Sequence, residues 1–199
     1  MRSRRKLGTA ERLREAVRGL RHLPDRILHS RRRRAIRETL QSRGVPRIAL
    51  VVCHGNICRS PYAAEALRGL FRDTGGVQVD SAGFVGPGRP SPPDAIASAH
   101  DRGVDLSHHR SKLLQPRDVG SADLILVMDA DQQRAICRRY SRDRDDVVVL
   151  GDLDPAPIDT RAILDPLGRP RDMFDASYRR IDRCLRELAG LLSGSVFAP

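Results

Sequence analysis

Short apolar runs without helical spacing recur along most of this chain. They are rich in Val, Ile and Leu, and they occupy residues 48–52, 77–79, 124–128 and 147–150. Runs of this length and composition are typical of strands that are buried on both faces of a sheet. The pattern therefore predicts four strands.

The segments between these runs carry apolar residues at helical spacing. The longest covers residues 172–192, and its apolar face consists of Phe174, Tyr178, Ile181, Leu185, Leu188 and Leu192. Shorter helices are predicted at residues 63–71, 92–103 and 130–140. Strands that alternate with helices predict an α/β fold, with a four-stranded parallel sheet and helices on both faces. In such sheets ligands bind beyond the carboxyl ends of the strands.

Residues 1–45 have a thinner apolar pattern. One short helix is indicated by a stripe at Leu13, Val17 and Leu20, and Pro24 interrupts it. A second helix is indicated by Ile27, Leu28, Ala35, Ile36 and Leu40. Gly44 and Pro46 mark a boundary before the first strand. We therefore expect a helical N-terminal extension over residues 1–45, followed by a domain at residues 46–199.

Positive charge is concentrated in this extension. The chain has a formal net charge of +11, but residues 1–47 hold 16 Lys and Arg against 4 Asp and Glu, whereas the rest is close to neutral. Two interpretations stay open. The extension is either a solvated arm that packs its apolar stripe on the core, or a basic anchor for an anionic membrane surface or an acidic partner. Residues 1–47 contain no aromatic side chain, so we predict no specific nucleic-acid partner.

The rest of the composition indicates a reducing, cytoplasmic setting. Four Cys in 199 residues do not suggest a disulfide framework, and no Cys-x2-Cys pair suggests zinc. No apolar run is long enough for a transmembrane helix, and the charged N-terminus lacks the apolar segment of a secretory signal. We expect no metal site and no cofactor.

The stretch from Cys53 to Pro61 joins the first predicted strand to a helix and has the composition of an anion-binding loop. Unpaired N–H groups and a positive partial charge mark the start of a helix. Gly55 can take a positive φ, and Asn56 tolerates one better than most residues. The backbone of His54, Gly55, Asn56, Ile57, Cys58, Arg59 and Ser60 can therefore form a ring of N–H donors.

Two side chains of this loop carry candidate chemistry. Arg59 supplies a planar fork that suits two oxygens of a phosphate group. Cys53 lies at the start of the loop, facing the helix, the Arg and the N–H donors, and we expect it to be a thiolate at neutral pH. A thiolate at the floor of an oxyanion cradle is placed to attack a bound phosphate.

The nine-residue string with its Cys-x5-Arg-Ser spacing resembles the low-molecular-weight protein tyrosine phosphatases. Stretches at residues 80–83, 103–110 and 123–129 are also similar to the family, so the resemblance covers roughly residues 46–192. It implies hydrolysis of phosphotyrosine in proteins through a phosphocysteine intermediate, with tyrosine-phosphorylated proteins as partners. It also implies the four-stranded parallel sheet already predicted.

The resemblance assigns further roles. The family's general acid and base is the Asp of an Asp-Pro pair shortly before the last helix, which matches Asp165 better than Asp154. Ser60 should donate its hydroxyl to the thiolate, and Asn56 should brace the loop with His109 as its partner. In the family the second loop Cys, here Cys58, can form a disulfide with the nucleophile.

The chain departs from the family directly after Asp165. Many members carry aromatic residues there that wall the substrate slot, whereas this chain has Leu167 and Gly168. Phe84 and Tyr62 are candidates to supply part of that wall.

Three alternatives remain. Arsenate reductase shares the fold but needs further thiols, for which Cys137 is the one candidate. Protein arginine phosphatases carry Thr at the position of Ile57. A non-enzymatic protein that binds anionic surfaces is the third.

Overall fold

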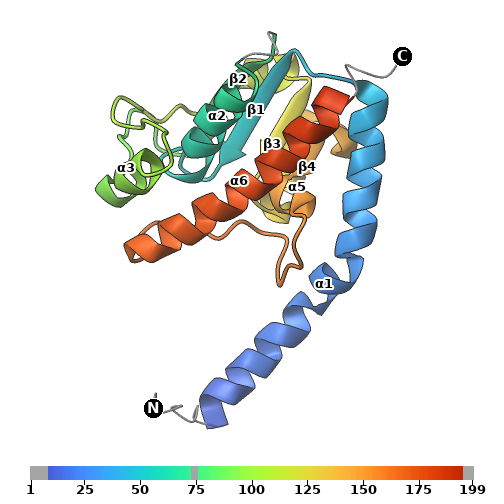
Figure 1. Ribbon diagram of the computed structural model, residues 1–199, viewed down its shortest axis with the longest axis vertical. Helices are drawn as coiled ribbons and strands as arrows, with labels where there is room; N and C mark the ends of the chain where they lie inside the picture. The colour runs from blue at the N-terminus through green and yellow to red at the C-terminus, as the bar shows by residue number, and fades with distance from the viewer. Residues whose placement is uncertain (1–8, 73–75, 195–199) are drawn as a thin grey trace.

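The computed structural model describes residues 9–72 and 76–194, with side chains described from residue 23 to residue 193 in these ranges. Its centre is a parallel sheet of four strands, β1 (Ile48–Cys53), β2 (Gln78–Gly83), β3 (Leu124–Val127) and β4 (Val147–Val149). Their order across the sheet is β2-β1-β3-β4 (Figure 1). The α/β fold and all four predicted strands are confirmed. β2 continues past its predicted end to Gly83, because its backbone pairs with β1 along the whole length.

Helices cover both faces of this sheet, as predicted. One face carries α2 (Arg59–Leu70), α3 (Pro93–His100) and α6 (Arg171–Gly194), and the other carries α4 (Pro116–Ser121) and α5 (Ala130–Tyr140). Successive side chains of a strand point to opposite faces. In β1, Val51 therefore joins the core under α2 and α6, while Leu50 and Val52 join the core under α4 and α5. The sequence pattern missed α4, which is only six residues long.

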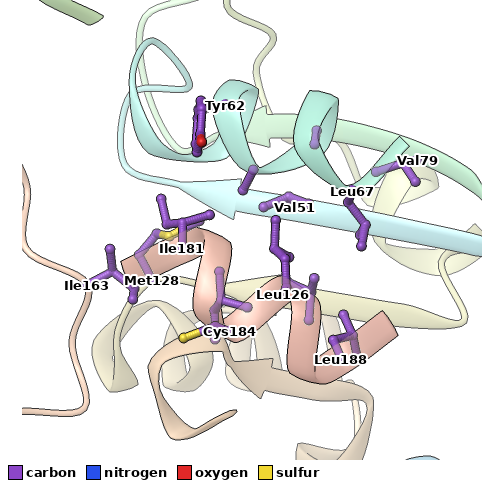
Figure 2. Close-up of a cluster of buried hydrophobic side chains, with 14 of the residues drawn as sticks. Val51, Tyr62, Leu67, Val79, Leu126, Met128, Ile163, Ile181, Cys184 and Leu188 are labelled. Atoms are coloured by element: carbon purple, nitrogen blue, oxygen red, sulfur yellow. The ribbon is translucent and has the colours of Figure 1, made fainter. Parts of the chain in front are cut away.

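The larger core lies between β1, β3 and α6. Figure 2 shows Ile181, Cys184 and Leu188 of α6 on the side of the helix that faces Val51 and Leu126. Each side chain of this size that leaves water contributes about 1.5–3 kcal/mol. The apolar face read from the sequence therefore fixes the orientation of α6 against the sheet, and with it the start of the helix near the candidate site.

The N-terminal extension forms one helix, α1 (Thr9–Arg43), with Pro24 inside it. The prediction of two helices separated at Pro24 was wrong. A proline removes one backbone hydrogen bond and crowds the preceding turn, which bends a helix but need not end it. Figure 1 shows such a bend partway along α1. The predicted stripe of Leu13, Val17 and Leu20 falls outside the described side chains.

The C-terminal half of α1 packs on the body of the molecule. Leu40 is buried in the larger core, and Ile36 packs against it. Arg33 and Arg37 both pair with Glu187 of α6. The interpretation of the extension as an arm packed on the core therefore holds for this half. None of the helices in the described ranges is long and apolar enough to cross a membrane.

Candidate active site

The loop between β1 and α2 lies at the carboxyl end of the sheet, beside the end of β2. Cys53 is the last residue of β1 and is directly opposite Gly83 of β2. A Cβ atom at Gly83 would lie 2.8 Å from the backbone nitrogen of Asn56. Only glycine lets the end of β2 approach the loop this closely. The end of β2 thus packs directly against the backbone of the loop.

The sulfur of Cys53 is buried and accepts two hydrogen bonds. The backbone N–H of Asn56 donates at 3.2 Å, and the hydroxyl of Ser60 donates at 3.0 Å. The Asn56 amide in turn donates to the same hydroxyl oxygen at 2.9 Å. Because the amide occupies a lone pair of the Ser60 oxygen, the hydroxyl proton is free to point at the sulfur. Both donors point at the sulfur and fix its position at the start of the loop.

Asn56 is the centre of the loop's hydrogen-bond network. Its φ is +51°, so the positive φ that the sequence allows at Gly55 or Asn56 falls on Asn56. Its amide N–H group also donates to Ser81 at 2.9 Å, and its amide oxygen accepts from the backbone N–H of Lys112 at 2.8 Å. With these bonds the buried side chain satisfies its polar groups and locks the loop in one conformation.

His109 contacts the loop where the resemblance implied. Its Nε2 lies 2.7 Å from the backbone oxygen of Asn56, so the partner is the main chain and not the amide. Burial lowers the pKa of His109 below its usual value, which outweighs the effect of that hydrogen bond. The ring is therefore neutral at neutral pH, and Nε2 must carry the proton because a carbonyl oxygen only accepts.

Arg59, the first residue of α2, links the loop to the segment that carries Asp165. Its guanidinium donates to the backbone oxygen of Ile163 at 3.0 Å and forms an ion pair with the Asp165 carboxylate. Its Nε–H is buried and has no partner among the described residues. This unpaired buried donor of Arg59 is available to an oxygen of a bound anion.

The two Asp-Pro pairs have different environments. The Asp165 side chain is 45% exposed and meets Arg59, whereas that of Asp154 is 1% exposed. Asp154 is held by Arg180 and Arg183 of α6. The structure thus brings Asp165 to the loop and buries Asp154 in a separate ionic cluster.

The remaining predicted residues divide between loop and core. His54 is exposed, while Ile57 and Cys58 are buried in the larger core. Burial, reinforced by nearby Cys53, raises the pKa of Cys58 to about 12, so it stays a neutral thiol.

Tyr62 does not wall a substrate slot. It is buried, its ring stacks on Tyr178 with centroids 3.8 Å apart, and its hydroxyl donates to Asp182 at 2.6 Å. The wall assignment of Tyr62 was therefore wrong, because the first turn of α2 points this side chain at α6. Phe84 is half-buried and packs against the core under α4 and α5. The exposed apolar side chains beside Asp165 are instead those of Leu164 and Leu167.

Three contributors to the loop were missed by sequence reasoning. They are the hydroxyl of Ser81, the backbone N–H of Lys112, and Arg89, whose guanidinium donates to the backbone oxygen of Gly55 at 3.1 Å. Ser81 lies in one of the stretches similar to the phosphatase family, and Lys112 lies two residues after the end of another. Nothing in the sequence signalled Arg89, because its contact depends on how the loop after β2 folds back.

Within the described residues, no group of three His, Cys, Asp or Glu side chains is placed to hold a metal ion. The site therefore consists of a thiol, a guanidinium, backbone donors and one carboxylate. Together these can bind a phosphate-like group, attack it and move a proton.

Comparisons with known proteins agree with this chemistry. The probable low molecular weight protein-tyrosine-phosphatase EpsP of Ralstonia nicotianae is 38% identical over 135 residues, which is 67% of this chain and 88% of EpsP. The protein-arginine-phosphatase of Bacillus subtilis is 31% identical over 142 residues, which is 70% of this chain and 93% of that protein. The crystal structure of the tyrosine phosphatase AmsI of Erwinia amylovora superposes with a TM-score of 0.67 at 29% identity, covering 75% of this chain and 95% of AmsI.

A family profile extends this similarity over most of the chain. The profile described as low molecular weight phosphotyrosine protein phosphatase matches residues 48–196, from the first residue of β1 to beyond α6. The matched region includes the Cys53 loop, His109 and Asp165. The chain therefore belongs to the low molecular weight phosphotyrosine protein phosphatase family.

Proposed function

We propose that Cys53, Arg59 and Asp165 hydrolyse phosphotyrosine in proteins in two steps. The Cys53 thiolate attacks phosphorus, forming an S–P bond, while the bond to the tyrosine oxygen breaks and Asp165 gives that oxygen a proton. Asp165 then takes a proton from a water molecule, whose oxygen displaces the sulfur and releases inorganic phosphate. The ion pair between Arg59 and Asp165, which brings the Asp-Pro segment to the end of the Cys53 loop, is the observation that carries this proposal.

The other loop residues serve these three. Arg59 and the backbone N–H groups of residues 54–59 stabilise the charge that develops on the phosphoryl oxygens. Ser60 donates to the Cys53 sulfur at 3.0 Å and would help the thiolate leave in the second step. The side chains of Asn56 and His109 hold the loop in place.

An aryl phosphate is the substrate class that the surroundings of Asp165 favour. Leu164 and Leu167 are 46% and 50% exposed, and they flank the carboxylate with apolar surface on which a ring can lie. The alternative is phosphoarginine, because one relative is named a protein-arginine-phosphatase. Arsenate reduction would need a relay of thiols, and the one candidate, Cys137 of α5, is partly buried against the core under α4 and α5.

Activity measurements separate these possibilities. Turnover of an aryl phosphate, phosphoarginine and arsenate should be compared side by side for the natural chain and for Cys53→Ser. We expect hydrolysis of the aryl phosphate to be fastest, and we expect Cys53→Ser to abolish it while phosphate still binds. Full activity of Cys53→Ser, or loss of activity on adding a chelator, would contradict the mechanism.

The proposed setting is the cytoplasm, where the enzyme would meet anionic surfaces or acidic partners through residues 1–45. Some arginines of α1 are engaged within the molecule, but Arg31 and Arg34 are exposed, and Ile27 beside them is 67% exposed. Sedimentation with anionic and neutral vesicles tests this. Binding to anionic vesicles that weakens with salt supports the proposal, and equal binding to both kinds contradicts it.

A further inference from the structure

The segment between β4 and α6 makes direct contact with α1. Residues 154–170 contain no helix or strand, so contacts from elsewhere hold their backbone in place. The carboxylate of Asp25, in α1, accepts a hydrogen bond from the backbone N–H of Arg161 at 3.1 Å. The Thr160 hydroxyl lies 3.4 Å from the same carboxylate oxygen. The other oxygen of Asp25 is held by Arg32 at 3.0 Å, which fixes the orientation of the carboxylate.

A second contact joins α1 to the start of the same segment. The buried ring of His29, one turn after Asp25, donates from Nε2 to the backbone oxygen of Asp154 at 2.9 Å. The Asp154 side chain binds Arg180, and Arg180 in turn donates to the backbone oxygens of Thr160 and Ala162 at 2.7 and 2.8 Å. The segment is therefore clamped between α1 on one side and α6 on the other.

The clamped residues lead directly to the active site. Ile163, two residues after Arg161, donates its N–H to the backbone oxygen of Met128 at 2.8 Å and accepts from Arg59 at 3.0 Å. Asp165 follows two residues later and pairs with Arg59. A shift at Arg161 would thus be transmitted along four residues to the carboxylate that meets the nucleophile's loop.

We propose that Asp25 of the N-terminal helix is a positioning residue for Asp165. It holds the backbone at Arg161 so that the Asp165 carboxyl group sits at the leaving oxygen. This inference rests on the proposed role of Asp165 as the proton donor. The matched family region begins at residue 48, so Asp25 belongs to a part of the chain that the family profile does not cover.

The test compares two substrates that differ in their need for a proton. Phenyl phosphate has a poor leaving group, whereas dinitrophenyl phosphate releases an anion that needs no proton. We would measure kcat/KM for the full chain, for Asp25→Ala, for Asp165→Ala and for the double variant. A misplacement on the order of 1 Å costs up to about 10²-fold, so Asp25→Ala should lower kcat/KM for phenyl phosphate by about tenfold or more. The value for dinitrophenyl phosphate should change little.

Two further variants separate positioning from loss of structure. Asp25→Asn keeps an oxygen that can accept from Arg161, so it should recover most of the loss. Asp159→Ala removes a carboxylate of the same segment that is 92% exposed and makes only a long, solvent-exposed ion pair with Arg26 of α1 at 3.9 Å, so it should leave both substrates nearly unaffected. Urea unfolding of each variant checks that it is folded under the assay conditions.

The double variant distinguishes failure of this inference from failure of the proposed function. If Asp25 acts through Asp165, adding Asp25→Ala to Asp165→Ala should cause no further loss. An additive loss, or an equal loss with both substrates, would refute the positioning role while leaving Asp165 as the acid. If Asp165→Ala itself shows no preference for the good leaving group, the proposed role of Asp165 is wrong, and the inference falls with it.

Discussion

The Cys53 loop and the segment that carries Asp165 meet at Arg59, but different kinds of contact hold them in place. Within the loop, Cys53, Asn56 and Ser60 bond to one another over eight consecutive residues. The Asp165 segment instead depends on partners far away in the sequence, including Asp25 and Arg59. The nucleophile's cradle therefore has a local set of hydrogen bonds, to which Ser81, Lys112 and His109 add distant support, whereas Asp165 is positioned by contacts between distant segments.

The comparison suggests different sensitivities for the two regions. A change in the loop should impair every substrate, because binding and attack both need the cradle. A change that moves only the Asp165 segment should impair mainly substrates that require a proton. The four predictions below use this difference, beginning with the largest expected effect.

Asn56→Ala should disrupt the hydrogen-bond network of the Cys53 loop. The variant loses the amide bonds to Ser60 and Ser81, and alanine disfavours the positive φ at this position. We expect kcat/KM to fall by about 10²–10³ for phenyl and dinitrophenyl phosphate alike, similar to removal of an oxyanion donor. Ser81→Ala is the matched control, because it removes only one of these bonds and should cost less. A loss confined to phenyl phosphate would show that the loop and the acid are not independent.

Removal of residues 1–45 should disturb the position of the Asp165 segment and leave the Cys53 loop intact. The truncation exposes the surface that Leu40 covers and removes Asp25 and His29. Burial of one leucine contributes about 2 kcal/mol, and each partly exposed ion pair contributes up to about 1 kcal/mol. We expect urea unfolding to show a loss of about 2–4 kcal/mol, with a larger decrease in kcat/KM for phenyl phosphate than for dinitrophenyl phosphate. If residues 46–199 fail to fold alone, the predicted domain boundary is wrong.

Substitution of two glycines by alanine would displace either the Asp165 segment or the Cys53 loop by steric contact. A Cβ atom at Gly151 would lie 2.1 Å from the backbone oxygen of Arg161, so Gly151→Ala must displace the Asp165 segment. We expect an effect of about tenfold in kcat/KM, confined to phenyl phosphate, since a misplacement of the acid on the order of 1 Å costs up to about 10²-fold. Gly83→Ala pushes on the loop instead and should affect both substrates. A Cβ atom at Gly120 would have no neighbour within 4 Å, so Gly120→Ala serves as the control. If Gly151→Ala lowered kcat/KM equally for both substrates, the Asp165 segment would not act separately from the loop.

The smallest expected effect is a pH dependence of stability at the contact between α1 and the Asp165 segment. Burial opposes ionisation of Asp25, but hydrogen bonds from Arg161 and Arg32 more than offset it and hold its pKa below the usual value. In the unfolded chain the pKa is about 3.9, so on acidification the unfolded state takes up a proton first. The stabilisation is therefore present above about pH 4 and is lost as the pH falls through the folded-state pKa.

Urea unfolding measures this contribution. The difference in unfolding free energy between the natural chain and Asp25→Asn should be largest near neutral pH and should shrink below about pH 4. Asp159→Asn, on the exposed part of the same segment, is the control. A difference between the natural chain and Asp25→Asn that does not change with pH would show that the ionised carboxylate is not what holds the contact.

Much of the fold could be predicted because its signals are local. The apolar runs that became β1, β3 and β4 and the apolar face of α6 are each contained in one stretch of sequence. The continuous helix through Pro24 and the short α4 could not be predicted in this way. The described hydrogen bonds and ion pairs of α1 with the body lie on the C-terminal side of the proline, between Asp25 and Arg43, and they are long-range.

The same division applies to the candidate site. The sequence by itself identified the loop, because Cys53, Asn56, Arg59 and Ser60 lie close together in a strand-loop-helix unit; the bonds to Ser81 and Lys112 that complete it came from the fold. It also offered two Asp-Pro pairs. Only the tertiary structure brought Asp165 to Arg59, buried Asp154 against Arg180, and attached the segment between them to Asp25. Those contacts join residues 26 to 136 positions apart, and they form only when the helices dock on the sheet.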